Sequence, residues 1–157
     1  MFKILKNTFL VVILGIFISA CSTTAKKSKS TSAGDVYTGT DTVKYLATGV
    51  ADRVFFATNS TGLTSAAKAT LTKQAGYIKA SKISVVIEGH ADERGTREYN
   101  LALGERRANA ARDYLMTKGV AKSSIKVISY GKERPANTDS SKLAWSQNRR
   151  SVTVKAN

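Results

Sequence analysis

The sequence predicts an α+β fold, a two-layer sandwich in which helices pack on one face of a mixed β-sheet. From about residue 50, short runs rich in β-branched and aromatic residues alternate with two long segments of helical periodicity. The resulting order is β-α-β-α-β, then a short helical turn and a last strand. Without its first 20 residues, the chain is long enough for one domain with a core but too short for two.

The first half of this domain contains two expected strands and one helix. A short β-rich run, Arg-Val-Phe-Phe-Ala, occupies 53–57. Thr64 then caps a helix that ends near Ala80. The apolar residues on one face of this helix are Ala67, Leu71, Ala75 and Ile78. The strongest strand pattern in the chain, Lys-Ile-Ser-Val-Val-Ile-Glu, follows at 82–88.

The second half repeats the alternation. A long helix runs from about Tyr99 to Lys118 and stops at Gly119, because glycine suits a left-handed helix cap. The third strand is expected at 125–130. After a loop with the only proline, a helical turn at 143–148 leads into a last strand at 151–155.

Residues 1–20 have the pattern of a lipoprotein signal peptide. Two lysines precede the apolar run Phe9–Ile18, which has the length of a signal-peptide core and is short for a bilayer span. The run leads into Ile18-Ser19-Ala20-Cys21, which resembles the lipobox of bacterial lipoproteins, where cleavage precedes a cysteine that carries acyl chains. An ordinary signal peptide is the alternative, but it leaves unexplained why the only cysteine lies at the cleavage point.

Residues 21–49 are expected to form a flexible tether that begins at lipidated Cys21. The stretch is rich in Ser, Thr, Lys, Ala and Gly and has too few large apolar residues to order itself. Four side chains are expected to dock locally on the domain: Tyr37, Val43, Tyr45 and Leu46. Because Ser22, and not aspartate, follows the cysteine, the expected anchor is the outer membrane, with the domain facing the periplasm.

The chain is strongly basic, with a formal net charge of +14. Nucleic acid is the usual partner of such a chain. An exported lipoprotein meets anionic lipid, lipopolysaccharide and cell wall instead, so no nucleic-acid partner is expected. The lysines are scattered along the sequence, which favours a solvated basic surface.

The segment Glu88–Gly95 is the first candidate for a functional loop. It crowds ionisable side chains between two glycines directly after the central strand, where α/β folds place ligands. On the following helix Arg107 lies inside the apolar arc, whereas Arg106 lies just outside it. A buried guanidinium needs an anion, and Asp92 is the nearest candidate. The pair is either a structural salt bridge or part of a binding site.

Several blocks together carry a resemblance to a known family. They are Glu-Gly-His-Ala-Asp-Glu-Arg-Gly-Thr (88–96), Glu-Tyr-Asn (98–100), Leu-Gly-Glu-Arg-Arg-Ala-Asn-Ala (103–110), Ser-Tyr-Gly-Lys-Glu-Arg-Pro (129–135) and Asn-Arg-Arg (148–150). In this order, after a lipobox and a tether, they resemble the peptidoglycan-associated lipoproteins of Gram-negative bacteria. These proteins carry an OmpA-like C-terminal domain, which binds peptidoglycan without cleaving it.

The resemblance implies a ligand and its contacts. In that family the residues matching Asp92 and Arg107 hold the ammonium and a carboxylate of meso-diaminopimelate in the peptidoglycan stem peptide. Asn100, backbone amides near Gly95 and the ring of Tyr99 are expected to complete the pocket. One departure concerns the pocket wall, where Ala57-Thr58-Asn59 lacks the acidic residue of typical members.

Other polar residues have simpler expected roles. His90 is expected to hydrogen-bond through its ring and fix the loop, beside Glu88. Arg149 and Arg150 either support the pocket or end the last strand, and support is favoured. Trp145 is expected to be packed. A metal held by Glu88, His90 and Asp92 is disfavoured because the chain has one histidine, and no cofactor is expected.

The expected function is therefore non-enzymatic. The resemblance implies a tether between the outer membrane and the wall that works with the Tol proteins, including their periplasmic β-propeller, in cell division and envelope integrity. One alternative is an OmpA-like lipoprotein without a Tol role. Another is a glycan hydrolase using Glu88, Asp92 and Glu93, but nearby arginines would lower the pKa of each carboxyl, whereas a general acid needs it raised.

Overall fold

The computed structural model describes residues 36–156. The predicted signal peptide, Cys21 and the first part of the predicted tether lie outside the described residues. Within residues 36–156, no helix combines the length and apolar character needed to cross a membrane.

Four strands form one mixed sheet: β3 (Arg53–Phe55), β4 (Val85–His90), β5 (Ile125–Gly131) and β6 (Arg150–Lys155). Their order across the sheet is β3-β6-β4-β5. Strand β6 runs antiparallel to both of its neighbours, whereas β4 and β5 are parallel. The parallel pair needs a crossover, and the helix between β4 and β5 supplies it.

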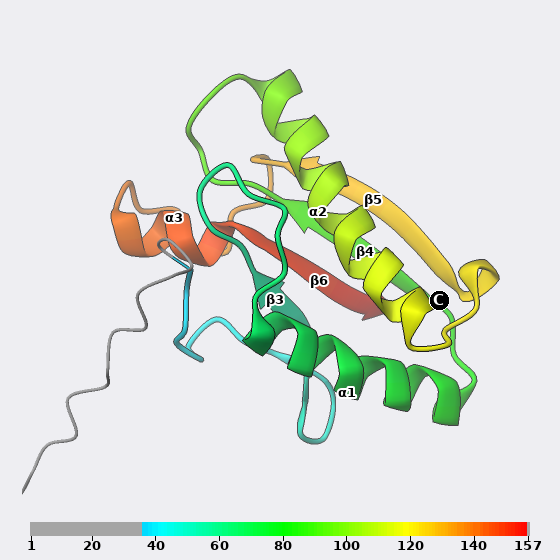
Figure 1. Ribbon diagram of the computed structural model, residues 1–157. Helices are drawn as coiled ribbons and strands as arrows, with labels where there is room; N and C mark the ends of the chain where they lie inside the picture. The colour runs from blue at the N-terminus through cyan, green and yellow to red at the C-terminus, as the bar shows by residue number, and fades with distance from the viewer. Residues whose placement is uncertain (1–35, 157) are drawn as a thin grey trace, which may run out of the picture.

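The two long helices, α1 (Ser65–Ser81) and α2 (Arg97–Thr117), cover the same face of this sheet (Figure 1). The short helix α3 (Lys142–Asn148) lies beside the start of β6, at the end of the sheet. The predicted two-layer α+β sandwich with a mixed sheet is confirmed.

Helix ends explain where the observed boundaries differ from the expected ones. Thr64 caps α1 as predicted, its hydroxyl accepting from the Ala67 amide at 3.1 Å. The helix continues to Ser81, and Lys82 closes it in a left-handed conformation with φ of 52°, so β4 starts at Val85. Helix α2 begins two residues before Tyr99, because Thr96 serves as its cap.

The core lies between the helices and the sheet. Its central side chains come from all layers: Val54, Phe56, Leu71, Ile78, Val85, Ile87, Leu115 and Ile125. Helix α2 approaches β4 most closely where Gly104 faces Gly89. A Cβ atom added to Gly89 would collide with the carbonyl of Gly104, and one added to Gly104 would collide with Ser129. Two glycines therefore set the distance between the second helix and the central strand.

The packed part of the chain begins before residue 50. Residues Tyr45–Ala47 (β1) and Val50–Ala51 (β2) pair as a short hairpin that the sequence analysis did not predict. Of the side chains expected to dock on the domain, Tyr37 and Leu46 are buried, whereas Tyr45 is 65% exposed. The Tyr37 ring lies edge-on to Phe55 at 4.8 Å between ring centroids. The end of the predicted tether thus packs on the domain.

Candidate functional site

A pocket of about 260 Å³ lies where β4 ends and α2 begins. Nine residues line it: Thr58, Asn59, Asp92, Arg94, Gly95, Tyr99, Asn100, Leu103 and Arg107. The structure therefore brings all five predicted ligand-binding residues together, namely Asp92, Gly95, Tyr99, Asn100 and Arg107. They come from one loop and the first half of one helix, and Thr58 and Asn59 on the β3–α1 loop form the opposite wall.

The turn before α2 fixes the pocket's geometry. Gly95 has φ of 94°, which side-chain-bearing residues rarely adopt, and it turns the loop into the helix. The Thr96 hydroxyl then accepts from the Tyr99 amide at 3.2 Å. Asn100 is buried, and its side-chain amide donates to the Arg94 carbonyl at 2.8 Å. The loop is thereby held against the first turn of α2, whose N-terminus favours anionic groups.

Arg107 is fully buried, as its place in the apolar arc predicts. Its guanidinium donates to the carbonyls of Ala57 (3.1 Å), Ser60 (3.0 Å) and His90 (2.9 Å). Burial, with the charge of Arg149, lowers its pKa from 12.5 to about 10, so the group stays charged at neutral pH. Arg107 thus ties the β3–α1 loop and the end of β4 to α2.

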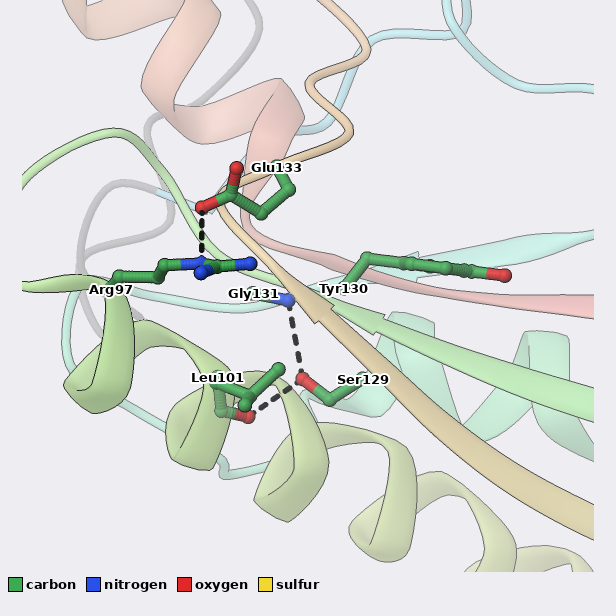
Figure 2. A pocket seen from close by; sticks show the side chains of 6 residues that line it. All are labelled: Arg97, Leu101, Ser129, Tyr130, Gly131 and Glu133. Atoms are coloured by element: carbon green, nitrogen blue, oxygen red, sulfur yellow. Dashed lines mark hydrogen bonds and ion pairs between the residues drawn. The ribbon is translucent and has the colours of Figure 1, made fainter.

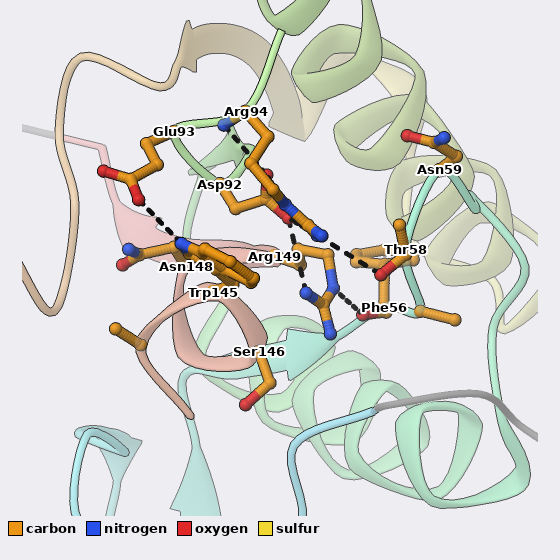
Figure 3. A network of polar contacts seen from close by, with 12 residues as sticks. Phe56, Thr58, Asn59, Asp92, Glu93, Arg94, Trp145, Ser146, Asn148 and Arg149 are labelled. Carbon is orange, nitrogen blue, oxygen red and sulfur yellow. Dashed lines mark hydrogen bonds and ion pairs between the residues drawn. The ribbon is translucent and has the colours of Figure 1, made fainter. Parts of the chain in front are cut away.

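Asp92 is paired with two other arginines (Figure 3). Arg94, two residues along the same loop, contacts one carboxylate oxygen through Nη2 at 2.6 Å and the other through Nε at 3.1 Å. Arg149 donates to Asp92 at 3.3 Å and to the Phe56 carbonyl at 3.1 Å. Burial by itself would raise the pKa of Asp92, but the hydrogen bonds from Arg94 and Arg149 outweigh it and hold that pKa below 3.8.

Of the two interpretations of this pair, the structural salt bridge between Asp92 and Arg107 is therefore wrong. Carbonyl groups of the β3–α1 loop and of the last residue of β4 satisfy the Arg107 guanidinium, and Arg94 reaches the carboxylate from within its own loop. Both Asp92 and Arg107 still line the pocket, so a carboxylate and a guanidinium flank the same space without neutralising each other directly.

The sequence profile of the OmpA family matches residues 55–149, which include the whole pocket. The chain belongs to the OmpA family. It is 42% identical over 160 residues to the peptidoglycan-associated lipoprotein of Agrobacterium fabrum, an alignment that covers 97% of this chain and 89% of that protein. The resemblance predicted from the sequence is thereby confirmed.

Two further comparisons support this membership. The peptidoglycan-associated lipoprotein of Mesorhizobium japonicum is 57% identical over 106 residues, covering 67% of this chain and 63% of that protein, which is just under two thirds of its length. The crystal structure of the peptidoglycan-associated lipoprotein from Burkholderia pseudomallei matches with a TM-score of 0.65 and 38% identity. That match covers 67% of this chain and 90% of the crystallised one.

Hydrogen bonds of Glu93, which were not predicted from the sequence, hold the β4–α2 loop of this OmpA-family domain to α3 and to the residue two positions before it. Glu93 accepts from the indole N–H of Trp145 at 2.7 Å (Figure 3). It also accepts from the hydroxyl of Ser140 at 3.1 Å. The guanidinium of Arg94 lies 4.3 Å from the centre of the half-buried Trp145 ring. The only sequence signal for any of these contacts is that Arg94 follows Asp92 by two residues, because a side chain at that position can fold back onto the carboxylate of its own turn.

The predicted supporting residues divide into two groups. Arg149 contacts Asp92 directly, so it supports the pocket. Arg150 instead donates to the carbonyls of Arg134 (3.0 Å) and Asn148 (3.4 Å), away from the residues that line the pocket. Glu88 and the His90 ring also lie outside the lining. They belong to the sheet face opposite α1 and α2, because Gly89 between them faces α2.

The expected hydrogen bond from the His90 ring is also wrong. Neither ring nitrogen has a hydrogen-bond partner among the described residues, and the nearest carboxylate oxygen, on Glu88, is 3.5 Å from Nε2. The buried ring packs beside Tyr130 at 5.6 Å between centroids. It is the backbone carbonyl of His90, through Arg107, that contributes to the site.

The buried His90 ring predicts a pH-dependent stability. Burial, aided by the charges of Arg150, Arg53 and Arg134, lowers its pKa from 6.5 to about 3. Between pH 6.5 and 3 the His90 ring is protonated in the unfolded chain but stays neutral in the folded protein. The contribution of neutral His90 to the free energy of unfolding is therefore fully present above pH 6.5 and decreases until the pH nears 3. By about pH 5 the loss should reach roughly 2 kcal/mol.

Urea unfolding of wild type and His90→Phe at neutral pH and near pH 5 checks this expectation. Phenylalanine keeps the ring packing and removes the titrating group, so the variant should lose roughly 2 kcal/mol less than wild type on acidification. Equal losses in the two proteins would show that His90 does not cause the pH dependence.

A second hollow, of about 230 Å³, lies between the start of α2 and the end of β5 (Figure 2). Exposed Arg97 and Glu133 form an ion pair across it at 3.3 Å, and Ser129 donates to the Leu101 carbonyl at 2.6 Å. Tyr130 points away from these groups. None of the predicted ligand-binding residues lines this hollow.

Among residues 36–156 no cluster of three or more His, Cys, Asp or Glu side chains is arranged to hold a metal ion. The Glu88, His90 and Asp92 set considered from the sequence separates in space, since Asp92 enters the pocket and His90 does not.

Proposed function

We propose that this chain binds peptidoglycan non-covalently, through the meso-diaminopimelate of the stem peptide, and so tethers the outer membrane to the cell wall. The observation that carries the proposal is the pocket in which Asp92, Asn100 and Arg107 meet. The zwitterionic end of diaminopimelate joins an ammonium and a carboxylate on one carbon, and the pocket lining offers the carboxylate of Asp92 for the first and the guanidinium of Arg107 for the second.

The side chains of the pocket support specific roles. Arg107 uses three of its five N–H groups on backbone carbonyls, which leaves two for a ligand carboxylate at the pocket floor. Asp92 is the carboxylate that receives the ammonium. Tyr99 and Asn59, whose side chains lie 3.5 Å apart, close the outer wall. Asn59 is neutral, so Asp92 is the only carboxylate among the lining residues.

The electrostatics argue against glycan hydrolysis. A glycosidase needs a carboxylic acid whose pKa is raised enough to donate a proton. Here the hydrogen bond from Trp145, followed by that from Ser140, lowers the pKa of Glu93, and Arg94 and Arg149 keep the pKa of Asp92 low. Both carboxyl groups are therefore suited to holding charge and not to donating a proton, which supports a binding role without catalysis.

The relatives extend the proposal to location and partners. The named relatives are peptidoglycan-associated lipoproteins, and we place this chain beside them as an outer-membrane lipoprotein facing the periplasm. A role with the Tol proteins, including their β-propeller, belongs to the same proposal. Affinity capture with that β-propeller tests it, since an OmpA-like lipoprotein without a Tol role would bind sacculi and fail to retain the propeller.

Replacement of the pocket carboxylate tests the wall-binding proposal. Wild-type protein should pellet with purified sacculi that contain diaminopimelate, and Asp92→Asn should bind at least tenfold more weakly because the ammonium loses its counter-charge. Asp139→Asn, an exposed acid outside the lining, is the matched control and should bind like wild type. Equal binding by all three proteins would contradict the site, and release of soluble glycan fragments would indicate a hydrolase.

The proposed anchor has its own test. Cys21→Ser should leave an uncleaved, unlipidated precursor, because acylation requires the thiol. Metabolic labelling with a fatty acid and fractionation of the envelope check this directly. A variant that still matures and still fractionates with the outer membrane would contradict the lipobox interpretation.

A further inference from the structure

Asp92 has no acceptor capacity left for a ligand. A carboxylate offers about four lone-pair sites. All four are used: one oxygen accepts from the backbone amide and Nε of Arg94, both at 3.1 Å, and the other from Arg94 Nη2 at 2.6 Å and Arg149 at 3.3 Å. An incoming ammonium must therefore replace one of these donors.

The two arginines differ in how freely they can leave. The Arg149 side chain is 1% exposed and also donates to the Phe56 carbonyl. Moving this side chain would leave the buried carbonyl without that hydrogen bond, which is costly. The Arg94 side chain is 41% exposed. It crosses from Asp92 toward Thr58, with 3.4 Å between Nη2 and the threonine hydroxyl, and both of these residues line the pocket (Figure 3).

We propose that Arg94 is a resident cation of the pocket: it occupies the ammonium position on Asp92 in the empty site and is exchanged for the ligand's ammonium on binding. This inference rests on the proposed function. The backbone amide of Arg94 can stay on Asp92 during the exchange, since only the side chain must move. Trp145, whose ring centre already lies 4.3 Å from the guanidinium, remains as its neighbour after release.

The exchange makes the pocket selective for a zwitterion. A ligand with only carboxylates cannot replace a guanidinium on Asp92, so it leaves Arg94 in place across the pocket. A ligand with only an ammonium displaces Arg94 but offers nothing to Arg107. A ligand that carries both charges on one carbon satisfies Asp92 and Arg107 at once.

Removing the resident cation gives the sharpest test. The full chain in detergent is titrated calorimetrically with free meso-diaminopimelate. Arg94→Gln should bind it at least fivefold more tightly than wild type, because the ligand's ammonium no longer competes with the Arg94 guanidinium for Asp92. Arg97→Gln is the matched control, because that side chain is 74% exposed and outside the pocket lining, and its affinity should stay within twofold. Pimelate, which lacks both amines, should bind neither wild type nor Arg94→Gln measurably.

Direct observation of the arginine in the wild-type chain keeps the test independent of the variant's folding. In nitrogen-15 NMR spectra, the Nε–H resonance of Arg94 should shift on addition of meso-diaminopimelate as it leaves Asp92, whereas that of Arg149 should keep its position. If Arg94→Gln binds more weakly than wild type, or as tightly, or if the Arg94 resonance does not move in a saturated sample, the exchange is wrong. If the wild-type chain binds neither sacculi nor meso-diaminopimelate, the proposed function itself fails.

Discussion

Replacing Arg107 by alanine should lower the free energy of unfolding by about 4 kcal/mol, which destabilises the domain, and should abolish wall binding. The side chain is fully buried and holds the carbonyls of Ala57, Ser60 and His90. Its loss leaves these acceptors without their charged donor and opens a cavity at the floor of the pocket. A domain of this size is stable by roughly 5–15 kcal/mol, so Arg107→Ala should remain partly or wholly folded and can be measured by urea unfolding.

Two further variants separate folding from binding. Arg107→Lys keeps a positive charge but loses the planar fork, so it should fold better than the alanine variant and still bind sacculi at least tenfold more weakly than wild type. Arg106→Ala removes the exposed neighbour and should change sacculus binding by less than about threefold. Equal losses of binding in Arg106→Ala and Arg107→Ala would show that the pocket is misplaced.

Gly89→Ala should destabilise the domain by about 3 kcal/mol, at the upper end of what overpacking typically costs, because the added atom meets main chain. The added methyl group would meet the Gly104 carbonyl, which is part of α2 and cannot rotate away as a side chain would. Relief requires α2 to move from β4, and this shift would also separate Arg107 from the carbonyls that it binds. Thermal and urea unfolding measure the loss.

The control for this steric argument is another glycine of the same domain. Gly76 lies within α1, and a Cβ atom added there would meet nothing within 4 Å. Gly76→Ala should therefore stabilise the domain by about 0.5–1 kcal/mol through helix propensity. A loss of stability in Gly76→Ala as large as that in Gly89→Ala would contradict the close approach of helix and strand as the cause.

The sequence predicted the sandwich because its main elements have strong local signals. The apolar face of α1, the Thr64 cap and the Gly119 stop, observed with φ of 82°, are all encoded within a few residues. The hairpin at 45–51 was missed because it depends on distant packing. Leu46 is buried in the core and Tyr37 lies against Phe55, contacts that no local periodicity reveals.

The candidate site shows a similar limit. Helical phase predicted that Arg107 is buried and Arg106 exposed, since phase decides which way a helical side chain points. It could not predict what Arg107 contacts, because carbonyls of the β3–α1 loop and of the end of β4 supply the partners. For the same reason it missed Arg94, whose contact with Asp92 depends on the conformation of one turn and one side chain.

The central claim is that the pocket between the β4–α2 loop and the β3–α1 loop binds diaminopimelate. A nitrogen-15 NMR titration of the folded chain with meso-diaminopimelate tests it most directly. We expect the largest amide shifts at residues 58–59, 92–96 and 99–100, and we expect Asp92→Asn to lose them. Shifts concentrated around Arg97, Ser129 and Glu133 at the second hollow, or no shifts at saturating ligand, would contradict it.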